Sequence, residues 1–238
     1  MLAGGAAAEL LELESADGTR FSAAFTGSAD GGAPAVVIYP DVRGLYPFYV
    51  ELTERFAQAG HHAIAIDFFG RTAGLGPRGE DFDYAEHVPK TSSGQIQADT
   101  RAAIDAVAER TGATTAATVG FCFGGGESFL AATNPDLGLA GAVGFYPGLN
   151  RARWGLDSPK DHAAELRCPF LGLFGGEDQA IPLDMVEQFD QDLDQSGKPH
   201  EIVVYPGAPH SFFDRRQEDY ADASEDAWRR VLDFLKSR

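Results

Sequence analysis

Three residue types that cooperate in nucleophilic catalysis, Cys122, Asp178 and His210, follow apolar runs of this chain. The segment Gly120-Phe121-Cys122-Phe123-Gly124-Gly125-Gly126 comes directly after the run Ala117-Thr118-Val119. Small residues on both sides of a nucleophile allow a sharp strand-to-helix turn, which exposes the middle side chain in a strained backbone conformation. The pattern therefore indicates a hydrolase with the Cys122 thiol as nucleophile.

Two other readings of these glycines are weaker. A phosphate-binding P-loop ends in Gly-Lys-Ser/Thr, whereas this chain has Gly125-Gly126-Glu127, whose carboxylate would repel a phosphate. A dinucleotide-binding loop spaces its glycines as G-x-G-x-x-G, an order that this segment lacks. A third alternative stays open on these residues alone, because a lone buried cysteine often serves only as a small hydrophobic residue.

The candidate acid and base follow two later apolar runs. Asp178 ends Gly175-Gly176-Glu177-Asp178, and His210 lies in Pro206–Phe212. The order nucleophile, acid, base is that of the α/β-hydrolases. A free thiol, with a pKa near ~8.5, is only slightly ionised at neutral pH, so His210 would take its proton. Asp178 would accept a hydrogen bond from the other ring nitrogen. Glu177 is the alternative acid, and we favour Asp178 because it lies farther past the strand.

An acyl transfer also needs donors for the developing oxyanion. In this fold they are the amide after the nucleophile, here Phe123, and an amide in the loop after an earlier strand, here Val42 in Pro40–Gly44. The remaining histidines and Cys168 lack such a setting. We expect Cys168 to be a packing residue and the other histidines to have surface or capping roles, namely His61, His62, His87, His162 and His200.

Short apolar runs alternate with amphipathic segments along the chain, which predicts an α/β fold. The expected architecture is an open, doubly wound, mostly parallel sheet with helices on both faces, in a single domain over residues 1–238. The predicted strands are 36–39, 63–67, 117–121, 142–146, 170–174 and 202–205, and the predicted helices are 48–59, 96–110, 128–133, 183–195 and 223–235. Two further runs, 10–14 and 20–25, flank Asp17-Gly18 and predict an antiparallel hairpin at a sheet edge. We expect 27–34 to be a surface turn and 70–93 to be irregular.

The composition limits the partners of the chain. Lys and Arg total 19 against 36 Asp and Glu, a formal charge of −17 over 238 residues, which opposes binding to nucleic acid or anionic membranes. The acidic clusters lack EF-hand spacing and predict solvated surface. Two cysteines are too few for a disulfide framework or a structural zinc site. No stretch approaches the ~18 apolar residues of a membrane span, and the first residues do not resemble a secretory signal. We therefore expect a cytoplasmic monomer or weak homo-oligomer without metal or cofactor.

Five motifs together resemble the dienelactone hydrolase family of α/β-hydrolases, over nearly the whole chain. They are Val36–Gly44, Ala65–Arg71, Gly120–Gly125, Gly175–Asp178 and Pro209–Phe212. The resemblance implies the roles already assigned to Cys122, His210, Asp178 and the amides of Val42 and Phe123.

The resemblance also implies roles that the residues alone did not suggest. A family glutamate that helps to generate the thiolate corresponds to Asp41, which is one methylene shorter. Arg71 matches the first of two arginines that hold a substrate carboxylate, while the second position, four residues after the histidine, is Asp214, with Arg215 and Arg216 beyond it. Tyr146 matches a tyrosine that lines the pocket, and Ser211, beside His210, is expected to contact substrate.

The sequence thus predicts a cofactor-independent hydrolase of lactones or small esters that works through a Cys-His-Asp triad and a thioester acyl-enzyme. A general small-ester carboxylesterase or thioesterase is the alternative. From a different class, a redox-sensing protein would oxidise Cys122 without turning over esters.

Overall fold

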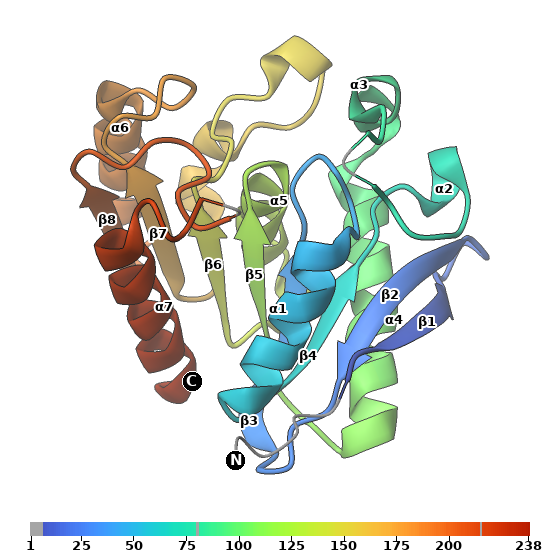
Figure 1. The fold of residues 1–238 in the computed structure, drawn as a ribbon. Coiled ribbons are helices and arrows are strands. Elements are labelled where there is room, and N and C mark those ends of the chain that lie inside the picture. The colour runs from blue at the N-terminus through green and yellow to red at the C-terminus, as the bar shows by residue number, and fades with distance from the viewer. Residues whose placement is uncertain (1–6, 80, 215) are drawn as a thin grey trace.

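A twisted eight-stranded sheet organises the part of the chain that the structure describes. The structure is a computed structural model, and it describes residues 7–79, 81–214 and 216–238. The strand order is β1-β2-β4-β3-β5-β6-β7-β8 (Figure 1). The strands are β1 (Glu9–Glu14), β2 (Arg20–Thr26), β3 (Gly32–Tyr39), β4 (His61–Ile66), β5 (Ala116–Phe121), β6 (Gly141–Phe145), β7 (Phe170–Gly175) and β8 (His200–Tyr205).

Strands β3 to β8 are parallel, while β1 and β2 form an antiparallel hairpin whose second strand pairs antiparallel with β4. The hairpin lies at one edge of the sheet, as the alternation around Asp17-Gly18 predicted. The α/β fold class with an N-terminal hairpin is therefore confirmed.

Helices cover both faces of the sheet. Helices α1 (Pro47–Gln58) and α7 (Ala221–Lys236) lie on one face, and α4 (Ser93–Thr111), α5 (Phe123–Ala132) and α6 (Leu183–Asp194) lie on the other (Figure 1). Two short helices, α2 (Gly70–Ala73) and α3 (Tyr84–His87), interrupt the segment that we expected to be irregular. Single 3-10 turns occur at Val88–Lys90, Pro135–Leu137, Ala152–Trp154, Pro159–Asp161 and Ala163–Glu165.

The start of α5 differs most from the expectation among the long helices. Sequence periodicity predicted a helix from Ser128, because three consecutive glycines are poor helix formers. The structure begins the helix at Phe123, immediately after the candidate nucleophile. Neighbouring backbone explains the first two of these glycines, because a Cβ on Gly124 would lie 2.1 Å from the Pro40 carbonyl oxygen and a Cβ on Gly125 would lie 2.9 Å from that of Phe145.

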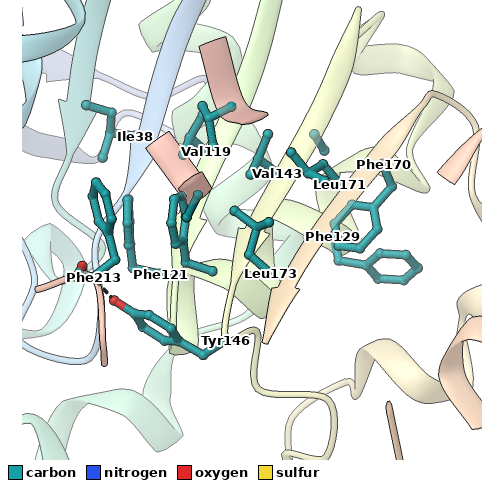
Figure 2. Close-up of a cluster of buried hydrophobic side chains, with 14 of the residues drawn as sticks. Ile38, Val119, Phe121, Phe129, Val143, Tyr146, Phe170, Leu171, Leu173 and Phe213 are labelled. Carbon is teal, nitrogen blue, oxygen red and sulfur yellow. Dashed lines mark hydrogen bonds between the residues drawn. The ribbon is translucent and has the colours of Figure 1, made fainter. Parts of the chain in front are cut away.

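The central strands are buried over their whole length. Every residue of β5, β6 and β7 is buried. Aromatic rings fill the space beside them: the ring of Phe121 stacks on that of Phe145, with centroids 4.7 Å apart, and Phe213 packs against both (Figure 2). Cys168 belongs to this core, in agreement with its expected packing role. Within the described ranges, no helix is long and apolar enough to cross a membrane.

Candidate active site

Cys122 occupies a strained turn between β5 and α5. Its backbone has φ 54° and ψ −112°, a conformation that non-glycine residues rarely adopt. Neighbouring backbone explains the flanking glycines: a Cβ on Gly120 would lie 2.0 Å from the Gly124 carbonyl oxygen, and a Cβ on Gly124 would lie 2.1 Å from that of Pro40. The glycines are thus required for the turn that exposes the Cys122 side chain.

We expect Gly124→Ala to destabilise the protein by more than about 3 kcal/mol, because the clash involves backbone atoms that no rotamer change can move. The measurement is chemical unfolding beside Gly94→Ala. Gly94 also lies in a helix, but a Cβ there meets nothing within 4 Å, so its replacement should be neutral or stabilising by up to about 1 kcal/mol. Equal unfolding midpoints for the two variants would contradict this account of the elbow.

His210 and Asp178 lie together at the same sheet edge, past β8 and β7. The Nδ1–H of His210 donates a hydrogen bond of 2.6 Å to Oδ2 of Asp178. The other oxygen of Asp178 accepts from the amides of Ala180 and Ile181, at 2.8 and 3.2 Å. Glu177, the alternative acid, is exposed. The geometry therefore pairs His210 with Asp178.

Backbone contacts hold the two loops in register. The Gly176 amide donates to the Tyr205 carbonyl at 2.8 Å, and the Glu177 amide donates to that of Ala208 at 2.9 Å. A Cβ on Gly175 would lie 2.5 Å from the Ala208 carbonyl oxygen, so only glycine allows this approach. Asp178 and His210 are placed by rigid main chain rather than by side-chain packing alone.

The environment of His210 favours its charged form. Burial of the ring lowers its pKa, but the hydrogen bond to Asp178, the hydrogen bond to the Cys122 thiol and the charges of both partners outweigh burial and raise the pKa to about 10. An imidazolium at neutral pH can stabilise a thiolate beside it. The arrangement of Cys122 and His210 therefore suits a thiolate nucleophile.

The two expected oxyanion donors flank Cys122. Phe123 is the first residue of α5. The first amides of a helix have no acceptor within it and form its partially positive end. Val42 lies in a tight turn that the Gly44 amide closes on the Asp41 carbonyl at 3.0 Å. Among the described residues, neither the Val42 nor the Phe123 amide donates a hydrogen bond within the protein. Both amides can therefore serve a bound oxyanion.

Asp41 points into an ion-pair network beside Cys122. Both of its carboxylate oxygens accept hydrogen bonds of 3.0 Å from Arg43 Nε, and the Arg43 amide donates to Oδ1 at 2.8 Å. Arg43 Nη2 contacts Asp41 and also donates to Asp214 Oδ2 at 2.5 Å. The Tyr46 hydroxyl completes the network by donating to Asp214 Oδ1 at 2.8 Å. The carboxylate of Asp41 is therefore directed to Arg43.

Cys122 and His210 border two cavities. One, of about 320 Å³, is called the polar cavity here after its charged and polar residues; it is lined by Asp41, Val42, Arg43, Tyr84, Ser211, Asp214 and Arg216 in addition to the pair. The other, of about 340 Å³, is lined by the segment 148–154, by Ala180 and Ile181 before α6 and by Met185 of α6. A substrate with its carbonyl at Cys122 has room for a group on either side.

Ser211 and Tyr146 take different positions near the site. Ser211 lines the polar cavity, as expected, and has an unusual φ of 59°. Tyr146 is fully buried and lines neither cavity beside Cys122. Its ring packs on that of His210 with centroids 4.9 Å apart, and its hydroxyl donates to the Phe213 carbonyl at 2.9 Å (Figure 2). Burial raises the pKa of Tyr146 well above its usual range, so the hydroxyl stays neutral. Tyr146 therefore contacts the segment after β8 at His210 and Phe213.

The structure does not bring Arg71 to Cys122. Its guanidinium donates to Asp99 of α4, at 2.6 and 2.9 Å, and to Asp17 of the β1–β2 turn. Arg71 lines neither cavity beside the thiol. Arg71 follows β4, as the resemblance implied, but it lies in α2 and two carboxylates from distant segments bind it. Arg215, the other arginine noted near the second position, lies outside the described residues.

A buried ion pair behind the elbow was not anticipated from the sequence. Arg151 Nη1 donates to Glu127 Oε1 at 2.5 Å, and both side chains are almost fully buried. Arg151 lines the second cavity, and Glu127 belongs to α5. The pair thus connects α5, the helix that begins after Cys122, to the wall of that cavity. Glu127 had been noted only as an argument against phosphate binding.

Known proteins match this chain over most of its length. The model of the "Dienelactone hydrolase family" matches residues 21–238. A protein of Escherichia coli K12 named "Putative carboxymethylenebutenolidase" is 34% identical over 222 residues, covering 87% of this chain and 78% of its own length. A "Probable 2-oxo-3-(5-oxofuran-2-ylidene)propanoate lactonase" of a Bradyrhizobium species is 29% identical over 87% of this chain and 84% of its own.

The crystal structure of a "Putative Dienelactone Hydrolase" from Klebsiella pneumoniae has a TM-score of 0.82 and 31% identity, and the match covers 97% of this chain and 100% of that one. A doubly wound sheet with a strained strand-to-helix turn after β5 is typical of an α/β-hydrolase. The chain belongs to the dienelactone hydrolase family and is a hydrolase of the kind that acts on ester or lactone bonds.

Proposed function

We propose that this chain hydrolyses lactones or small esters through a thioester on Cys122, with His210 as the base and Asp178 orienting it. The observation that carries the proposal is the thiol at a strained elbow beside a histidine whose other nitrogen binds a buried carboxylate. The names of the Escherichia coli and Bradyrhizobium relatives support a lactone, and the two cavities beside Cys122 leave room for open-chain esters.

The proposed reaction has two halves. The Cys122 thiolate attacks the carbonyl carbon, and the resulting oxyanion accepts hydrogen bonds from the Val42 and Phe123 amides, each typically worth about 3–4 kcal/mol in the transition state. Collapse of this intermediate breaks the C–O bond, and the leaving oxygen takes the proton of His210. Neutral His210 then deprotonates a water molecule, which attacks the thioester and releases the acid and the thiolate.

We further propose that residues 1–238 act as one domain, as a monomer or weak homo-oligomer, on a small-molecule substrate. The reaction as written uses no metal or cofactor. A cytoplasmic setting agrees with a nucleophile that must stay reduced. General carboxylesterase or thioesterase activity is the alternative within the same mechanism.

Trapping the acyl-enzyme tests the mechanism directly. After brief mixing with p-nitrophenyl acetate, we expect the intact protein to gain one acetyl group, located by peptide mass spectrometry on Cys122. Steady-state hydrolysis of a dienelactone measured in parallel ranks the substrate classes. An acetyl group on another side chain would overturn the thioester, and peroxide oxidation of Cys122 without turnover of any ester would favour the redox-sensing alternative.

A further inference from the structure

Two carboxylates and one guanidinium meet in the wall of the polar cavity beside Cys122. Asp41 and Asp214 share the single guanidinium of Arg43, and all three side chains are about nine-tenths buried. With both carboxylates ionised, the three groups carry a net charge of −1. Within this group of described residues the charge of Arg43 is therefore more than matched, although an arginine lies in the cavity wall.

The hydrogen-bonding capacity of Arg43 is directed away from a ligand. Nε and Nη2 donate to carboxylates, and Nη1 is buried and has no hydrogen-bond partner among the described residues. The guanidinium also lies over the ring of Tyr46, 4.2 Å from its centroid. Together these contacts hold Arg43 against the wall, so a bound carboxylate could pair with it only if the side chain moved to expose Nη1 or if Asp41 or Asp214 were displaced.

Among the described residues, His210 and Arg216 are the other basic side chains that line this cavity. His210 pairs with Asp178, and Arg216 is directed elsewhere. Its Nε donates to Asp219 and its Nη2 to the Tyr220 hydroxyl, both at 3.1 Å. Its side chain is 61% exposed, so water and salt weaken its attraction for an anion. It does not offset the two buried carboxylates.

From this balance we infer that the enzyme selects neutral ester or lactone substrates and rejects those with a carboxylate in the polar cavity. The inference rests on the proposed function, since it names the substrate class of the same site. Asp214 is the residue that determines the selectivity, because it lines the cavity and pairs with the guanidinium that Asp41 already neutralises. A like charge placed against these carboxylates would weaken binding of an anionic substrate.

The test compares two esters with the same five-carbon acyl chain, which ends in a methyl group in p-nitrophenyl pentanoate and in a carboxylate in p-nitrophenyl hydrogen glutarate; both rates are corrected for uncatalysed hydrolysis. The readout is the ratio of kcat/KM values, because a general loss of activity in a variant cancels from it. For the unmodified enzyme we expect the neutral ester to be favoured by about 10-fold to 100-fold.

Two variants should move this ratio in opposite directions. Asp214→Asn releases Arg43 from one carboxylate and should shift the ratio at least about tenfold toward the anionic ester. Arg43→Gln leaves both carboxylates without a cation and should shift it further toward the neutral ester. The control is Asp105→Asn, which makes the same charge change and breaks an exposed pair with Arg101 on α4. The control ratio should equal that of the unmodified enzyme.

The outcomes distinguish a failure of the selectivity from a failure of the proposed function. Equal rates for the two esters, a preference for the glutarate, or a ratio that Asp214→Asn leaves unmoved would overturn the selectivity and leave the hydrolase intact. If the unmodified enzyme cleaved neither these esters nor a dienelactone, the proposed function would fail, and the selectivity with it.

Discussion

Replacing Cys122 with alanine is expected to lower kcat/KM for esters and lactones by at least about 10⁴-fold, since the variant has no atom that can form the acyl-enzyme. The fold should survive. The Cys122 side chain is only partly buried, and alanine has the same backbone restrictions as cysteine at φ 54°. The measurements are steady-state hydrolysis and the midpoint of chemical unfolding.

Cys168→Ala is the matched control for this variant. Cys168 is buried in the core, and burial raises the pKa of its thiol to about 11, so it is protonated at neutral pH. This variant should keep its activity and lose about 1–3 kcal/mol of stability from the smaller side chain. Activity that persists in Cys122→Ala and disappears in Cys168→Ala would sink the assignment of the nucleophile.

The Cys122→Ser variant tests whether the reaction needs the sulfur atom itself or only a nucleophilic group in the same place. The hydroxyl could occupy the same place, but it is a poorer nucleophile that needs stronger assistance from its base. His210, with a pKa near 10, is protonated at neutral pH and is a weak proton acceptor for a hydroxyl. We therefore expect Cys122→Ser to retain little activity. The site is matched to a nucleophile that can itself exist as an anion.

The proximity of Cys122, Asp178 and His210 could be predicted from sequence because it follows from local rules. Parallel strands bring their carboxyl ends to one edge, so the residues after β5, β7 and β8 had to lie near each other. The choice of Asp178 over Glu177 also agreed with the geometry, since only Asp178 faces His210. Strand patterns and chain order were enough for these positions.

The environment of the arginines could not be predicted in the same way. Arg71 was placed in the substrate site by its loop, but Asp17 and Asp99, which bind it, lie on a turn and a helix that only the tertiary fold brings near. Arg43 and Asp214 are 171 residues apart in the chain. The clue available in the sequence was the presence of two residues: Arg43, which follows Val42, and Asp214, which stands where the resemblance implied an arginine.

Removal of the carboxylate behind His210 should have the second-largest effect on the reaction. We expect Asp178→Asn to lower kcat/KM at neutral pH by a factor on the order of 10³, because the hydrogen bond that holds the imidazole and favours its charged form is lost. The asparagine Oδ1 can still accept from the Ala180 and Ile181 amides, so the loop should keep its shape. Glu177→Gln makes the same charge change one residue away at an exposed position and should remain close to wild type.

The pH dependence distinguishes an effect on His210 from general damage. A pKa raised to about 10 keeps the imidazolium through neutral pH, so wild-type kcat/KM should fall on the alkaline side near pH 10. In Asp178→Asn the largest of the influences that raise this pKa is gone, and the alkaline limb should move to lower pH. An unchanged limb would refute the coupling of Asp178 to His210.

Stability should follow the same titration. A folded-state pKa above the unfolded value, near ~6.5 for histidine, means that the charged ring stabilises the fold fully below pH ~6.5. This contribution declines as the pH rises and is lost near pH 10, where folded His210 gives up its proton. The gap in unfolding free energy between wild type and Asp178→Asn should therefore be largest in mild acid and narrow steadily toward pH 10. A gap independent of pH would mean that Asp178 stabilises the loop without acting on the charge of His210.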